Sequence, residues 1–72
     1  MAEGSHRVWR LRKLHQSIDA SVLEDRDGGV ELRFVLNGEL MYVRRWPTRL
    51  LALEDASARR AELEREGWLA HW

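Results

Sequence analysis

Apolar side chains recur at every second position in four segments between Val8 and Arg44. A period of two residues places alternate side chains on the same face of a β-strand. Four such segments, separated by turn residues, predict an antiparallel β-meander. The alternating apolar residues are Trp9 and Leu11, then Ile18, Ala20 and Val22, then Val30, Leu32, Phe34 and Leu36, and finally Met41 and Val43.

The dipeptide Asn37-Gly38 predicts a two-residue hairpin turn, because both residue types accept the positive φ of a type I′ turn. This register pairs Phe34 with Met41 and Leu32 with Val43, and so gives the hairpin one apolar face. On its other face, the expected pairs are Glu31 with Arg44 as an ion pair and Arg33 with Tyr42.

The other two turns are constrained by the need to keep the apolar residues on one face. A three-residue loop containing Gly28 pairs Val22 with Phe34, and a five-residue loop of the same parity is the alternative. A two-residue turn at His15-Gln16 is compatible with the first hairpin. It would pair Leu11 with Ala20 and Arg12 with Asp19.

One helix is predicted from Arg49 to Glu66, a segment without Gly or Pro. Thr48 is the expected N-cap, and Gly67 is the expected glycine beyond the last turn, with Trp68 packing back on the helix. The apolar stripe comprises Leu53, Ala56 and Leu63, flanked by Leu50 and Ala52. The tail, residues 69–72, is expected to be too short for another element, and Trp72 either folds back or reaches a partner.

The predicted fold is therefore α+β, a four-stranded antiparallel β-meander with one C-terminal α-helix packed on one face. Residues 1–6 are expected to be a flexible N-terminus, in which Gly4-Ser5-His6 is either native or an expression-vector scar. Residues 7–72 form the single domain.

A chain of 72 residues has a thin stability margin and often depends on a disulfide, a metal or a partner subunit. It contains no cysteine, and His6, His15 and His71 have no metal-ligand spacing. We therefore expect no metal or other cofactor. A partner subunit or a well-packed core remains as the source of stability.

The charges balance, with 12 Lys and Arg against 12 Asp and Glu. A neutral chain has no general attraction to nucleic acid or anionic membranes. The sequence also has no apolar run long enough for a membrane span and no signal-peptide pattern. Together with the absence of cysteine, this favours the cytoplasm.

The sequence contains no catalytic motif. Its four serines lie outside any nucleophile elbow, and Gly28-Gly29 joins two strands rather than a strand and a helix. The carboxylates of the helix fall on its predicted solvent side. We expect a protein that is not an enzyme and has no small-molecule substrate.

The sheet face away from the helix is the candidate interaction surface. The residues proposed for it are Arg10, Arg12, Arg33, Val35, Leu40, Tyr42, Arg44 and Trp46. This face is either an ordinary exposed surface, a protein interface, or a nucleic-acid surface with Arg on phosphates and Tyr42 and Trp46 stacked on bases. The preferred function is a non-enzymatic protein-interaction module that self-associates, with a second copy in a homodimer or another protein as its partner. The alternative is a small nucleic-acid-binding or transcription-associated protein that uses this face.

Three motifs carry a resemblance to known proteins: Asn37-Gly38, Trp46-Pro47-Thr48-Arg49 and Glu66-Gly67-Trp68. With them, residues 29–68 resemble a class of short bacterial proteins of unknown function, in which a hairpin leads into a helix that ends in Gly-Trp. The layout is also similar to that of WGR domains, which accompany nucleic-acid enzymes. The Trp-Gly-Arg motif itself is missing, because Arg44-Arg45-Trp46 is followed by Pro47. The resemblance implies a fold and no function.

Overall fold

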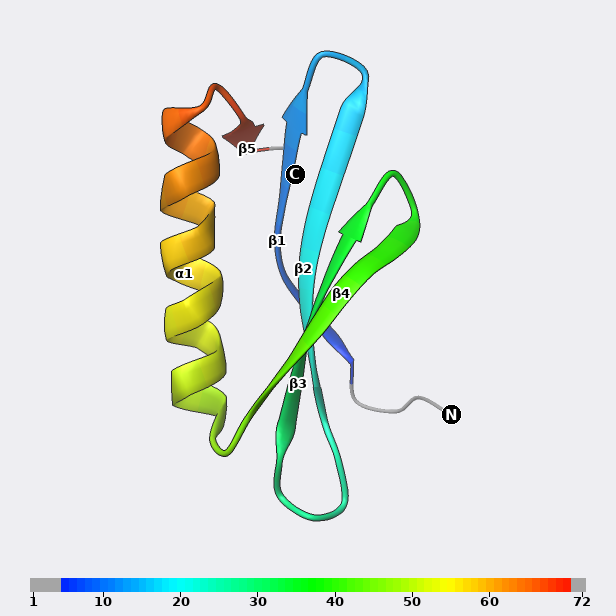
Figure 1. Cartoon of the computed structure of the whole chain (residues 1–72), viewed down its shortest axis with the longest axis vertical. Coiled ribbons are helices and arrows are strands. Elements are labelled where there is room, and N and C mark those ends of the chain that lie inside the picture. Colours follow the sequence, from blue (N-terminus) through cyan, green and yellow to red (C-terminus); the bar gives the residue numbers. More distant parts are fainter. Residues whose placement is uncertain (1–4, 71–72) are drawn as a thin grey trace.

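The computed structural model describes residues 5–70, which form one antiparallel sheet and one long helix (Figure 1). The elements are β1 (His6–Lys13), β2 (Gln16–Glu24), β3 (Val30–Leu36), β4 (Glu39–Trp46), α1 (Arg49–Arg65) and β5 (Leu69–Ala70). The strand order across the sheet is β4-β3-β2-β1-β5. This confirms the predicted α+β meander and helix. No helix within residues 5–70 is long and apolar enough to cross a membrane.

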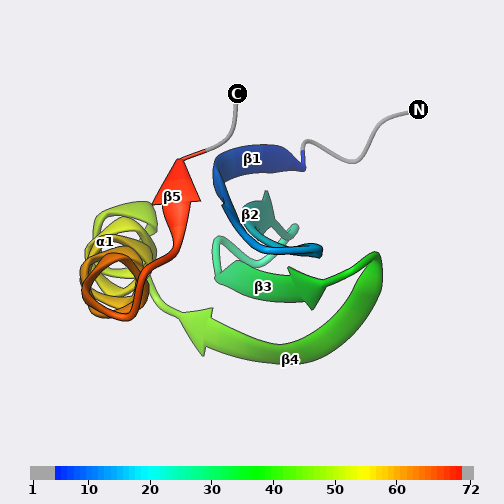
Figure 2. The same ribbon diagram turned by 90° about the horizontal axis from the view of Figure 1, so that it is seen from above.

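The sheet is curved, and α1 lies along one side of it, next to the short strand β5 (Figure 2). Between sheet and helix lies an apolar core that includes Trp9, Phe34 and Trp68. The indole Nε1 of Trp9 donates a hydrogen bond to the carbonyl oxygen of Ala56, 2.9 Å away. Because Ala52 and Ala56 are the fully buried helix residues, the helix backbone can lie close to the sheet.

Asn37 and Gly38 have φ angles of 53° and 85° and form the predicted two-residue turn. Beyond the first two pairs, however, the register differs from the prediction. A β-bulge lies at Met41, so that Phe34 is opposite Tyr42 rather than Met41. One inserted residue moves every later side chain of β4 to the opposite face.

The bulge corrects three expectations about β4. Glu31 is opposite Arg45 instead of Arg44, and Arg33 is opposite Val43 instead of Tyr42. Met41 and Val43 were expected in the core, but they are 47% and 39% exposed. The physical reason is that the shift brings larger rings to the helix side. Tyr42 and Trp46 both pack against the core there.

The loop between β2 and β3 has five residues, 25–29, and therefore matches the longer of the two predicted lengths. The parity is as expected, with Ala20 opposite Phe34.

The first turn is Leu14-His15 rather than His15-Gln16, so Leu11 is opposite Ile18. β1 begins at His6, inside the segment assigned to a flexible N-terminus.

Helix α1 begins at Arg49 as predicted and ends at Arg65, one residue earlier than predicted, with Glu66 as its C-cap. The hydroxyl of Thr48 accepts a hydrogen bond from the backbone N–H of Leu51 at 3.2 Å. Gly67 has φ 103°, and the N–H groups of Gly67 and Trp68 donate to the carbonyls of Glu64 and Leu63. These two bonds define a Schellman motif.

Strand β5 corrects the expectation that the tail forms no further element. Ala70 is opposite Leu11 and Leu69 is opposite Arg12, so the tail extends the sheet beside β1. The Schellman motif explains this placement, because it reverses the chain direction at the helix end. Trp72 lies outside the described residues.

Candidate interaction surfaces

The structure divides the eight predicted surface residues between the two faces of the sheet. Those that point away from α1 are Arg10, Arg12, Arg33, Val35 and Leu40. Those on the helix side are Tyr42, Arg44 and Trp46. We call the face that points away from α1 the open face. It comprises Arg7, Arg10, Arg12, Ser17, Asp19, Ser21, Leu23, Glu31, Arg33, Val35, Leu40, Val43 and Arg45.

Tyr42 is engaged with the core and the helix. Its ring stacks on Phe34 with 4.8 Å between centroids, and its hydroxyl accepts a hydrogen bond from Arg59 Nη2 at 2.9 Å. This bond to Tyr42 raises the pKa of Arg59. The ring therefore serves packing and does not face outward as a stacking platform.

Trp46 and Arg44 share one acceptor on the helix. The indole Nε1 of Trp46 donates to Asp55 Oδ2 at 3.2 Å, and Arg44 Nε lies 3.3 Å from the same oxygen. The Arg44 guanidinium also lies 5.5 Å from the centroid of the Trp46 ring, within cation–π range. The nucleic-acid alternative requires the rings of Tyr42 and Trp46 on the open face, where bases could stack on them. Both rings lie on the helix side instead.

Carboxylates on the same face pair with several arginines of the open face. Asp19 accepts two hydrogen bonds from Arg10, at 2.8 and 3.1 Å, and lies 3.8 Å from Arg7 Nε. The bond to Asp19 raises the pKa of Arg10. Arg33 donates twice to Glu31 Oε1. Much of the positive charge is thus balanced within the sheet.

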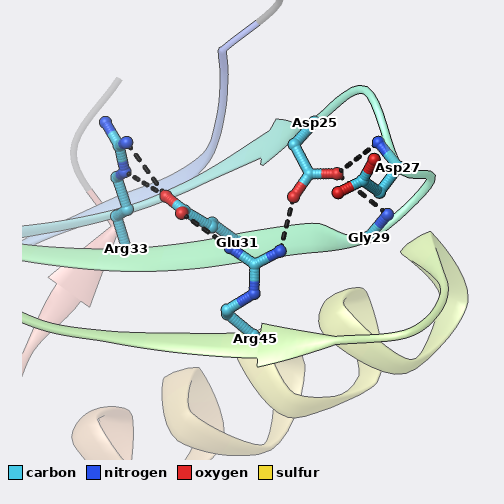
Figure 3. A network of polar contacts seen from close by, with 6 residues as sticks. All are labelled: Asp25, Asp27, Gly29, Glu31, Arg33 and Arg45. Carbon is cyan, nitrogen blue, oxygen red and sulfur yellow. Dashed lines mark hydrogen bonds and ion pairs between the residues drawn. The ribbon is translucent and has the colours of Figure 1, made fainter.

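Arg45 connects strand β4 to the loop before β3 (Figure 3). One nitrogen of its guanidinium pairs with Glu31 and another with Asp25. The other oxygen of Asp25 accepts hydrogen bonds from the backbone N–H groups of Asp27 and Gly29, at 3.0 and 3.1 Å (Figure 3). The bond from Arg45 is the main reason that the pKa of Asp25 lies below its usual value.

This network predicts a pH-dependent contribution to stability. A carboxyl whose folded pKa is lowered stabilises the fold above its ordinary pKa, 3.8 for Asp25, and this contribution is lost as the pH falls through the folded pKa. Asp25→Asn should therefore be less stable than the parent at neutral pH, and the difference should vanish as the pH falls through the lowered pKa of Asp25. Urea unfolding across this range measures it. Arg45→Gln should reduce this pH dependence and leave only the part due to the backbone N–H groups of Asp27 and Gly29. An undiminished pH dependence in that variant would rule out the ion pair as its main cause.

Strand β4 forms one edge of the sheet and carries a group of exposed apolar side chains. Leu40, Met41 and Val43 are 57%, 47% and 39% exposed. Leu40 and Val43 lie on the open face, where Leu40 is opposite Val35. Sequence reasoning missed Met41 and Val43 because an unbulged strand would have buried them.

Within residues 5–70, no group of three or more His, Asp or Glu side chains is placed to hold a metal ion. Every buried side-chain nitrogen and oxygen in this part of the chain has a hydrogen-bond partner. The core thus offers no unpaired polar atom for a ligand.

Comparison of the chain with protein-family models, with curated proteins and with solved structures found no match in any of the three. The resemblances drawn from the turn and helix-end motifs gain no support from these comparisons.

Proposed function

We propose that the chain is a non-enzymatic protein-interaction module of the cytoplasm that self-associates by pairing its β4 edge with β4 of a second copy. The observation that carries the proposal is the exposure of Leu40, Met41 and Val43 on an edge strand. An edge strand presents unpaired backbone groups to another strand. Exposed apolar side chains beside those groups add area that a partner can bury.

The sequence of β4 is complementary to itself in one antiparallel register. If Leu40 of one copy lies opposite the partner's Val43, two apolar residues of the open face meet. The same register sets Glu39 opposite the partner's Arg44. Both of these lie on the helix side, because Glu39 is opposite Leu36 and Arg44 is opposite Leu32. Opposite charges and apolar pairs on matching faces both favour strand pairing.

The two-fold symmetry of this register repeats each favourable pair. The partner's Leu40 lies opposite Val43, and the partner's Glu39 lies opposite Arg44. A shift of one residue would place Leu40, on the open face, against the partner's Arg44, on the helix side. Because paired residues must share a face, that neighbouring register is disfavoured.

Molar mass from size-exclusion chromatography with light scattering tests the self-association. We expect a dimer for the parent chain. Leu40→Lys should weaken dimerisation about ten-fold or more, since the charge loses its water at the apolar pair. Leu50→Lys is the matched control, because Leu50 is an exposed leucine on α1. A parent chain that stays monomeric at millimolar concentration would refute the proposal.

Engineered cysteines test the register, and the parent chain contains no cysteine to interfere. Opposite residues have Cβ atoms about 5 Å apart, close to disulfide reach. A mixture of Leu40→Cys and Val43→Cys proteins should therefore form a mixed disulfide. Neither variant should crosslink alone, because like residues would be about 10 Å apart along the strands. A dimer in which Leu40→Cys crosslinks to itself would contradict this register.

A further inference from the structure

The bulge at Met41 sets two neighbouring side chains on the same face of β4. In a regular strand, consecutive side chains point to opposite faces. Here Leu40 and Val43 lie on the open face, while Tyr42 lies on the helix side. Met41 also lies on the helix side, because it lines a hollow there together with Leu63 of α1. The order of faces from Leu40 to Val43 is therefore open, helix, helix, open.

This order of faces is the same in both directions along the strand, as a two-fold strand pair requires. When Leu40 lies opposite the partner's Val43, the symmetry axis passes between Met41 and Tyr42. In a regular strand, an axis between two residues would pair side chains of opposite faces. With one extra residue in each strand, all four pairs from Leu40 to Val43 share a face. The bulge thus permits this register, which sets Met41 opposite the partner's Tyr42.

The hollow beside Met41 and Tyr42 has a volume of about 150 Å³. Two of its lining residues, Ile18 and Phe34, are almost completely buried, so the hollow is apolar where it meets the core. Sites for whole small molecules usually have about 300–1,000 Å³, so this space suits a single side chain instead. The residues that line it are Ile18, Phe34, Met41, Tyr42, Arg59 and Leu63.

The polar groups that line the hollow are bonded to each other or to the helix. Arg59 donates one hydrogen bond to the hydroxyl of Tyr42 at 2.9 Å and another to Glu62 Oε1 at 3.0 Å. This arrangement favours an apolar occupant over a charged one. A methionine side chain suits such a space, because it is unbranched and flexible and its sulfur makes favourable contacts with aromatic rings.

We propose that Met41 of each copy fills this hollow in its partner, with the thioether against the ring of the partner's Tyr42. Opposite residues have Cβ atoms about 5 Å apart, so the side chain can reach that ring. The occupant is a second copy because the hollow is continuous with the β4 edge, where the same register also pairs Glu39 with the partner's Arg44. This inference rests on the proposed β4 pairing and names the side chain at its centre.

Isotope-filtered nuclear Overhauser spectroscopy tests the exchange. One half of the sample is deuterated except for ¹³C-labelled methionine methyl groups, and the other half is unlabelled. We expect cross-peaks from the labelled Met41 methyl to the ring protons of Tyr42 and the methyl protons of Leu63 in unlabelled copies. A parent chain that is a dimer by light scattering yet shows no such cross-peak would overturn this inference alone. A monomeric parent would overturn it together with the β4 pairing.

Two variants of Met41 test the need for an apolar side chain. Met41→Gln has a similar length but brings a polar amide into the hollow, so dimerisation should weaken about ten-fold or more. Met41→Leu keeps an apolar side chain of similar volume and should weaken it much less. Leu50→Gln changes an exposed leucine of α1 and should leave dimerisation unchanged. A Met41→Gln chain that dimerises as tightly as the parent would also overturn the inference.

Discussion

Trp9→Ala should leave the chain largely unfolded at room temperature. The indole is almost completely buried, lies 6.2 Å from the ring of Phe34 between centroids, and donates its N–H to the Ala56 carbonyl. Removing a buried aromatic side chain costs about 3–5 kcal/mol. A small domain has a total stability of only about 5 kcal/mol, so little would remain. Far-ultraviolet circular dichroism with urea titration measures the loss.

Trp9→Phe is the matched control for the cost of losing Trp9. It keeps an aromatic ring in the core but loses the bond to Ala56, and so should remain folded with stability lower by about 1–3 kcal/mol. An alanine variant as stable as the phenylalanine variant would show that the indole site is not the centre of the core.

Tyr42→Ala should be the next most damaging change, at about 2–3 kcal/mol. The ring stacks on Phe34, and the hydroxyl accepts the bond from Arg59 that joins β4 to the helix. Urea unfolding monitored by tryptophan fluorescence measures the change. The expected loss depends on the bulge at Met41, because without it Tyr42 would lie on the open face, where truncation costs little.

Two further variants separate the contributions at this position. Tyr42→Phe keeps the stack and loses only the hydrogen bond, with an expected cost of about 1 kcal/mol. Val43→Ala, at the next residue on the open face, should cost less than about 0.5 kcal/mol in the monomer. If Val43→Ala destabilised the fold more than Tyr42→Ala, the register without the bulge at Met41 would be correct.

The parts of the fold that sequence predicted well have local causes. Thr48 caps the helix because its hydroxyl reaches an N–H three residues on, and Gly67 ends it because glycine accepts φ 103°. Asn37-Gly38 specifies its own turn in the same way. Each of these signals depends on a few neighbouring residues and is therefore visible in the sequence.

The bulge has a cause that is distant in sequence. Tyr42 packs on Phe34 and accepts a hydrogen bond from Arg59, and Trp46 donates a hydrogen bond to Asp55. Because these contacts fix Tyr42 and Trp46 on the helix side, Met41 is the extra residue that has no partner on β3. Residue alternation around Met41 is equally compatible with both registers. As a consequence, Tyr42, Arg44 and Trp46 were predicted on the open face but lie on the helix side. Val43 and Arg45 lie on the open face instead. The pairing of β5 with β1 was missed for a similar reason, since two residues carry no periodicity.

The bond between Trp9 and Ala56 has a consequence for how the chain is made. Its two ends are 47 residues apart, and the core also needs Trp68, which follows the helix. During synthesis the meander emerges before the helix that covers it, so its apolar face stays uncovered until the residues up to Trp68 have also emerged. Until then the nascent meander is a stretch that chaperones can bind.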